Sequence, residues 1–175
     1  MRALAVLFPH KDIAVPFSET DRVTEELIKT RVSETITHLD RHVTNHRKIA
    51  IVRPGLPIAG QFEDIKFDKI IKSEPSNDSD FYFRLMNEKI KSHQVFLGGF
   101  SVFNGVGSLS NYAGNSYILP WLTDTAQVLA KAELEGHPIP GFDLIMHPDQ
   151  FYRRLREIEN LITTEANLGL ELRHN

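Results

Sequence analysis

Three histidines, His38, His42 and His46, lie four residues apart near the end of a long amphipathic pattern. On a continuous helix such positions share one face, so the three imidazoles would project together, with Asp40 nearby. Neutral imidazoles one turn apart can hold a zinc or nickel ion. No HExxH motif accompanies them, and histidine at a helix end also complements the helix dipole. A metal site is therefore an alternative to the simpler expectation of an exposed helix end.

A glycine-rich segment, FNGVGSLSNYAGN at 103–115, is a second place where chemistry could occur. It lacks the Lys-Ser or Lys-Thr of a P-loop and the glycine spacing of a dinucleotide-binding turn. Turns with positive φ and close backbone approach explain these glycines more simply. If the chain has a ligand pocket, we expect loop 98–117 to form it, with Asn104, Asn111 and Tyr112 in contact with the ligand.

His147 and Asp149 would complete that alternative pocket. They follow the apolar run FDLIM at 142–146, which reads as a strong strand, and open α/β sheets often place functional groups just past a strand end. His147 also precedes a proline at an expected helix start, so a capping role is simpler. No serine lies in a G-x-S-x-G elbow, and no pair of acids has a spacing typical of acid–base catalysis. We predict no catalytic residue.

The composition narrows the classes of function. The 175 residues include no cysteine, which excludes thiolate catalysis, zinc ribbons and iron–sulfur ligation. The net charge is −3 and the basic residues are scattered, so we expect no direct sequence-specific nucleic-acid binding. The apolar run after Met1 is too short for a signal peptide, and no later run could span a bilayer. We expect a protein of the cytoplasm, or of a virion if it derives from a phage, with no membrane contact and no cofactor.

The chain divides at the polar, proline-containing segment 73–78, which we interpret as a linker inside one domain of 1–175. Subregion 1–72 would hold a long helix at 19–46, capped by Ser18 or Thr20, and an extended arm. Subregion 79–175 would be an α/β core. Expected strands are 3–8, 12–17 at an edge, 48–52, 61–71, 142–146 and 168–172; expected helices are 79–92, 123–135 and one beginning at Pro148. These elements indicate an α+β fold with a mixed sheet flanked by helices, or alternatively a generic three-layer α/β domain.

Residues 79–160 resemble the shell proteins of encapsulins and tailed phages, the Hong Kong 97-type fold. Three stretches carry the resemblance. NEKIKSHQVFLGG is similar to the end of the spine helix, FNGVGSLSNYAGN to the loop that follows it, and LTDTAQVLAKAELEG-HPIPG-FDLIMHPDQFYRRL to the helix, turn, strand and helix of the axial domain. The stretch 53–72 would then match the strand that leads out of the elongated loop. The chain departs from the family in its short length and in the helix at 19–46.

The resemblance implies a structural subunit that assembles with itself and encloses a genome or protein cargo. The arm at 53–60 would lie across a neighbouring copy, and closed symmetry would combine many moderate interfaces. The alternative is a small α/β enzyme or ligand-binding protein whose pocket lies at loop 98–117 and His147. A third reading is a metal-binding regulatory protein that uses the three histidines of the first helix.

Overall fold

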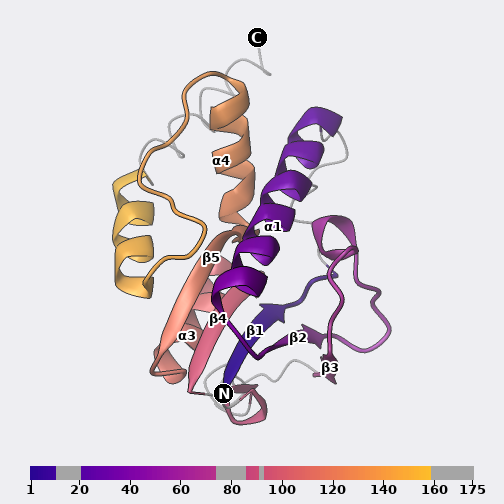
Figure 1. Ribbon diagram of the computed structural model, residues 1–175. Coiled ribbons are helices and arrows are strands. Elements are labelled where there is room, and N and C mark those ends of the chain that lie inside the picture. Colours follow the sequence, from indigo (N-terminus) through magenta and orange to yellow (C-terminus); the bar gives the residue numbers. More distant parts are fainter. Residues whose placement is uncertain (11–20, 74–85, 91–92, 159–175) are drawn as a thin grey trace.

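A computed structural model describes residues 1–10, 21–73, 86–90 and 93–158. Its centre is a five-stranded sheet in the order β3-β2-β1-β4-β5, and every strand pair in it is parallel (Figure 1). The strands are β1 (Arg2–Leu7), β2 (His46–Val52), β3 (Lys69–Lys72), β4 (Gln94–Gly99) and β5 (Ser116–Thr123). The connection from β3 to β4 moves the chain across β1, so the strand order reverses between β1 and β4.

The central strand β1 is buried on both faces, which explains its unbroken apolar sequence. Because side chains alternate along a strand, Ala3, Ala5 and Leu7 enter one apolar cluster, and Leu4 and Val6 enter the other. The domain therefore has a core on each side of the sheet. Polar backbone groups of β1 are satisfied by parallel ladders to β2 and β4.

Helices cover both faces of the sheet. The helices α1 (Arg22–His42) and α4 (Thr125–Leu134) lie side by side on the face of Leu4 and Val6 (Figure 1). The helix α3 (Gly107–Tyr112) and a helix over 148–158 pack against the other face. A π-helical turn, η2 (Val102–Val106), joins β4 to α3, and a short 3₁₀ turn, η1 (Gly60–Phe62), follows β2. The protein is thus a three-layer α/β fold.

The expected mixed α+β sheet is wrong, and the generic α/β alternative is confirmed. The segment 142–146 is no strand, because only Met146 pairs, in an isolated bridge to Ile118. Its apolar side chains are used instead to pack against the cores from a loop. The strand β5 was not expected from the sequence, and it contains Pro120. That proline lies where the β4–β5 register shifts, between Leu97 and Gly99, so no ladder hydrogen bond is lost.

Several other boundaries differ from the expectations. The first helix begins after Asp21, whose side chain accepts a hydrogen bond from the amide of Val23 at 3.0 Å, and it ends at His42. The strand expected at 61–71 is shorter, because only β3 (Lys69–Lys72) forms in that region. The glycine-rich segment 103–115 is mainly helical. The expected strands 3–8 and 48–52, the helix at 123–135 and the start of the last helix at Pro148 are confirmed within a few residues.

Residues 53–60 do not form an arm reaching away from the domain. The amide of Leu56 donates to the carbonyl of Arg53 at 3.3 Å, and the amide of Ala59 donates to the carbonyl of Pro9 at 3.1 Å. The segment is therefore a turn held against its own chain. Predictions for 12–17, Ser18, Thr20, 74–78, 79–85 and 168–172 fall outside the described residues. The division into one domain with two subregions stays a proposal, although β2 and β4, from either side of the linker, both pair with β1.

No helix in the described ranges is both long and apolar enough to cross a membrane.

Candidate functional site

A groove of about 1010 Å³ lies between α3 and the helix 148–158, and we call it the α3 groove. Its size is at the upper end of the range for small-molecule pockets, about 300–1,000 Å³. The groove combines two aromatic rings, two guanidinium groups and several other hydrogen-bonding side chains. Its walls are Phe103, Gly107, Ser108, Asn111, Asp149, Tyr152, Arg153, Arg156 and Glu157.

The π-helical wall of the groove is held from two sides through the backbone of Val102. Its amide donates to Oδ1 of Asp124 at 2.8 Å, and its carbonyl accepts from the hydroxyl of Tyr152 at 2.7 Å. Asp124 follows directly after β5, so the groove is anchored to the carboxyl edge of the sheet. Phe103, the next residue along, is 59% exposed and belongs to the groove wall.

The opposite wall begins where Pro148 starts a helix, at a position that needs no amide hydrogen. Phe151 and Leu155 are buried against the sheet and fix the rotation of this helix. Tyr152 therefore faces α3 and approaches Gly107, where an added Cβ would lie 3.1 Å from the phenol oxygen. The close approach of the two helices depends on the missing side chain of that glycine.

Positive charge in the groove is less compensated than negative charge. Glu157 is paired with Arg154 at 2.7 Å, whereas the part of the chain that the structure describes gives Arg153 no hydrogen bond or ion pair. Arg156 donates Nε to the carbonyl of Tyr152 at 3.3 Å, which leaves its terminal nitrogens for other acceptors. Asp149 is 94% exposed and its charge is strongly screened by solvent. Two guanidinium groups beside an exposed phenyl ring can bind an organic anion.

The titratable groups behind the groove are shifted toward their neutral forms. Burial raises the pKa of Asp124, and hydrogen bonds from backbone amides partly oppose that shift. Burial also raises the pKa of Tyr152, with the charge of Asp124 adding to the effect and Ser110 opposing it. The phenol of Tyr152 is therefore a hydrogen-bond donor and not a base at neutral pH.

Of the residues expected in a pocket, the structure brings Asn111 and Asp149 into the α3 groove. Asn104 is exposed on η2 and does not line it. Tyr112 packs half-buried against the core, and its carbonyl accepts from Asn87 at 3.2 Å. His147 accepts a hydrogen bond from the amide of Asp149 at 3.4 Å, a capping contact at the start of the last helix. The assignment of these residues to ligand binding stays a proposal.

The sequence did not predict that four residues would share a groove: Phe103, Tyr152, Arg153 and Arg156. The sequence does show two arginines on the helix face opposite Phe151, but that pattern is equally typical of a solvated helix surface. Only the packing of the helix beside α3 shows that they border a cavity. The only other indication in the sequence was Phe103, a large apolar residue in a glycine-rich segment.

The alternative metal site on one helix face is wrong in its geometry. The rings of His38 and His42 are 4.4 Å apart, but the helix ends there and Val43 is extended. His46 lies in β2, with Nδ1 2.7 Å from the carbonyl of Val43 and Nε2 3.3 Å from Oδ1 of Asp40. Among the described residues, which include all three histidines, no group of three side chains is placed to hold a metal ion.

Comparison with known proteins gives a distant likeness of fold. No family model matches the chain, and no curated protein matches its sequence. Among similar solved structures is an isochorismatase-like hydrolase from Alkaliphilus metalliredigens, with 15% identity and a TM-score of 0.48 over 87% of this chain and 97% of that one. Another is the YcaC gene product of Escherichia coli, described as an octameric hydrolase of unknown specificity, with 12% identity and a TM-score of 0.41 over 95% of this chain and 94% of that one.

The expected membership of the phage-capsid and encapsulin family, and with it a shell that encloses cargo or a genome, is wrong. The described strands form an all-parallel sheet with helices on both faces, not the mixed sheet that the resemblance implies. The three stretches that carry the resemblance also have other structures than it implies. The glycine-rich loop is a π-helical turn and α3, and the axial-domain strand at 142–146 is a loop. Short motifs in the right order produced the resemblance without the strand pairing of that fold.

Proposed function

We propose that this chain is a small α/β ligand-binding protein whose α3 groove takes an organic anion with a flat apolar part. The observation that supports this most is the exposed ring of Phe103 in the same groove as two arginines. The ring of Phe103 is 59% exposed to water, so a ligand ring that covers it gains the free energy of burying apolar surface. An aromatic carboxylate fits both kinds of wall.

Each part of such a ligand has a partner in the groove. The carboxylate accepts hydrogen bonds from Arg153 and from the free terminal nitrogens of Arg156, since guanidinium groups match its planar geometry. The ring lies against Phe103 in an offset or edge-on arrangement. Asn111 and Ser108, on α3, supply neutral donors and acceptors along the opposite wall. The side chains of the groove therefore indicate the chemical class of the ligand, and the volume of the groove limits its size.

The proposal is binding and does not include a reaction. Within the described ranges, no histidine or carboxylate makes a hydrogen bond to the hydroxyl of Ser108, the only aliphatic hydroxyl in the groove. Tyr152 donates its proton to a backbone carbonyl, and its raised pKa keeps it neutral. Neither group is activated as a nucleophile in this arrangement.

Self-association is a separate proposal that concerns the edge of the sheet. The edge strand β3 has Ile70 exposed to 53%, and edge strands offer unpaired backbone groups to a second copy. We expect a homo-oligomer in solution. Light scattering after size-exclusion chromatography measures the mass directly, and a monomer at all concentrations would contradict it.

Isothermal titration calorimetry with 1-naphthoate tests the proposed function. We expect saturable binding of 1-naphthoate and weaker binding of 1-naphthalenemethanol, which has the ring without the charge. Replacing Arg153 with alanine removes a charge-assisted hydrogen bond, about 1.5–3 kcal/mol, or roughly 10- to 150-fold in affinity. Phe103→Ala should weaken binding through the lost ring contact.

Arg41→Ala is the matched control, because Arg41 is an exposed arginine in the last turn of α1, far along the chain from the groove walls. It should bind 1-naphthoate like the unaltered protein. Equal affinity for the alcohol and the carboxylate would sink the charge argument. Unchanged binding by both Arg153→Ala and Phe103→Ala would place the ligand elsewhere.

A further inference from the structure

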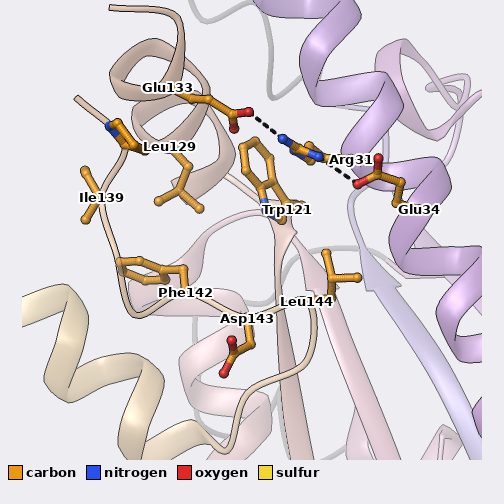
Figure 2. A pocket seen from close by; sticks show the side chains of 10 residues that line it. Arg31, Glu34, Trp121, Leu129, Glu133, Ile139, Phe142, Asp143 and Leu144 are labelled. Carbon is orange, nitrogen blue, oxygen red and sulfur yellow. Dashed lines mark hydrogen bonds and ion pairs between the residues drawn. The ribbon is translucent and has the colours of Figure 1, made fainter. Parts of the chain in front are cut away.

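A second cavity, of about 340 Å³, lies on the other face of the sheet between α1, α4 and the segment 136–146. We call it the Trp121 pocket. Figure 2 shows the indole of Trp121 at its centre, with Phe142 and Leu144 on the loop side and Arg31 beside the ring. The pocket shares no residue with the α3 groove, so it needs an explanation of its own.

The floor and sides of the Trp121 pocket are apolar. Trp121 is only 7% exposed, and Leu129 on α4 is also buried. Ile139, Phe142 and Leu144 are partly buried and come from the loop after α4. This accounts for the apolar segment 142–146, which the sheet does not use. A volume of about 340 Å³ suits a ligand with one ring or a short branched chain.

The polar end of the pocket carries excess negative charge. Arg31 forms ion pairs with Glu34, at 2.9 Å, and with Glu133, and its guanidinium carbon lies 5.7 Å from the centroid of the Trp121 ring. One positive and two negative charges leave a net charge of −1. Asp143, at the lower edge in Figure 2, adds a further negative charge at a greater distance.

Both glutamates retain an oxygen that can accept a hydrogen bond. Arg31 bonds to Oε2 of Glu34 and to Oε1 of Glu133. In the parts of the chain that the structure describes, Oε1 of Glu34 and Oε2 of Glu133 make no hydrogen bond. The two carboxylates come from different helices, α1 and α4, and Figure 2 shows the guanidinium of Arg31 between them. The two carboxylates are therefore acceptors at the edge of an apolar floor.

We propose that the Trp121 pocket binds a small organic cation, a primary amine with an aromatic or branched aliphatic body. The ammonium group donates to the second oxygens of Glu34 and Glu133, and the body lies against Trp121 and Phe142. An anion is disfavoured because Arg31, the only cation among the described residues that line the pocket, is already neutralised by two carboxylates. A neutral ligand of the same shape would leave those carboxylate oxygens without a donor.

The fluorescence of Trp121 tests the proposal directly, because it is the single tryptophan of the chain. The probes are phenethylamine, 2-phenylethanol and 3-phenylpropionate, which share a phenyl ring and differ in charge. We expect a saturable change in emission with phenethylamine, which added salt weakens. The alcohol and the carboxylate should give no saturable change over the same concentrations. An alcohol or a carboxylate that changes the emission of Trp121 at the same concentrations as the amine would overturn the proposal, and so would an unchanged emission with the amine.

Variants of the two glutamates supply an independent test. Glu34→Gln should bind phenethylamine about fivefold more weakly, the upper end for a half-exposed ion pair, and Glu26→Gln, on the exposed side of α1, should not differ from the unaltered protein. In Glu34→Gln/Glu133→Gln the charge of Arg31 is uncompensated, so the preference should reverse toward 3-phenylpropionate. A double variant that is folded by circular dichroism and still prefers the amine would contradict the assignment. If the double variant does not fold, the comparison of the three probes on the unaltered protein decides alone.

Discussion

Asp124 gives the sharpest stability prediction, because its carboxylate is half-buried and has one structural task. It follows β5 and accepts a hydrogen bond of 2.8 Å from the amide of Val102, at the start of the π-helical turn. Burial disfavours the charged form and raises its pKa. The hydrogen bond is useful to the fold, whereas the charge is not.

Two replacements separate the hydrogen bond from the charge. Asp124→Asn keeps an oxygen acceptor for Val102 and removes the charge, so we expect a free energy of unfolding within about 1 kcal/mol of the unaltered protein at neutral pH. Asp124→Ala leaves the amide of Val102 without its acceptor. A lost partner of this kind costs about 1–3 kcal/mol, so the alanine variant should be clearly less stable than the asparagine variant.

The pH dependence follows from the direction of the shift. A pKa that is raised in the folded state contributes stability below the ordinary value of an aspartate, and the contribution is lost as the pH rises through the raised value. Asp124→Asn lacks this titration. The unaltered protein should therefore lose stability relative to Asp124→Asn as the pH increases through the acidic range.

Urea unfolding at a series of pH values measures this difference, with the slope of each transition compared to verify that the unfolded states match. Subtracting the two curves cancels the titration of every other carboxylate. A difference that is constant with pH, or that favours the unaltered protein at higher pH, would refute the reasoning. An asparagine variant as unstable as the alanine variant would show that the hydrogen bond to Val102 is not what Asp124 contributes.

Four further substitutions test the packing. Gly99→Ala would put a Cβ 2.0 Å from the carbonyl oxygen of Leu7 at a φ of +101°, so chemical denaturation should show a loss of about 3–5 kcal/mol in the free energy of unfolding, or the variant should fail to fold. Gly114→Ala has open space around it and should cost only about 1 kcal/mol in the same measurement. Phe151→Ala should cost about 3–5 kcal/mol in the same measurement, because its fully buried ring fills the core under the last helix. Tyr152→Phe should cost about 1 kcal/mol through the lost hydrogen bond to η2. It should also remove from an alkaline absorbance titration a phenol that ionises above the ordinary range of tyrosine, since burial raises the pKa of Tyr152. A cost near zero, or an unchanged titration, would contradict the assigned contact.

The elements that follow from apolar periodicity were predictable from the sequence. The strand β1 is an unbroken apolar run, and α1 shows a stripe that buries Ile28, Val32 and Leu39. The last helix is marked by Pro148 and by its buried positions. In each of these segments the tertiary packing favours the same structure as the local apolar pattern, so that pattern is enough to predict the element.

The elements that were missed depend on contacts between distant parts of the chain. The strand β5 tolerates Pro120 because it lies at the edge of the sheet and its register with β4 shifts there. The segment 142–146 is apolar because it covers two cores and the Trp121 pocket, which its sequence cannot distinguish from a strand. In the candidate site, the glycine-rich segment of the sequence indicated Asn111. Arg153 could not be predicted, because it borders the groove only through the packing of its helix beside α3.

A crystal structure of the protein soaked with 1-naphthoate tests the proposed function most directly. We predict the ligand in the α3 groove, with its carboxylate on Arg153 and Arg156 and its ring against Phe103. An empty α3 groove at a concentration that saturates binding in solution, or the ligand bound at another surface, would contradict the proposed function.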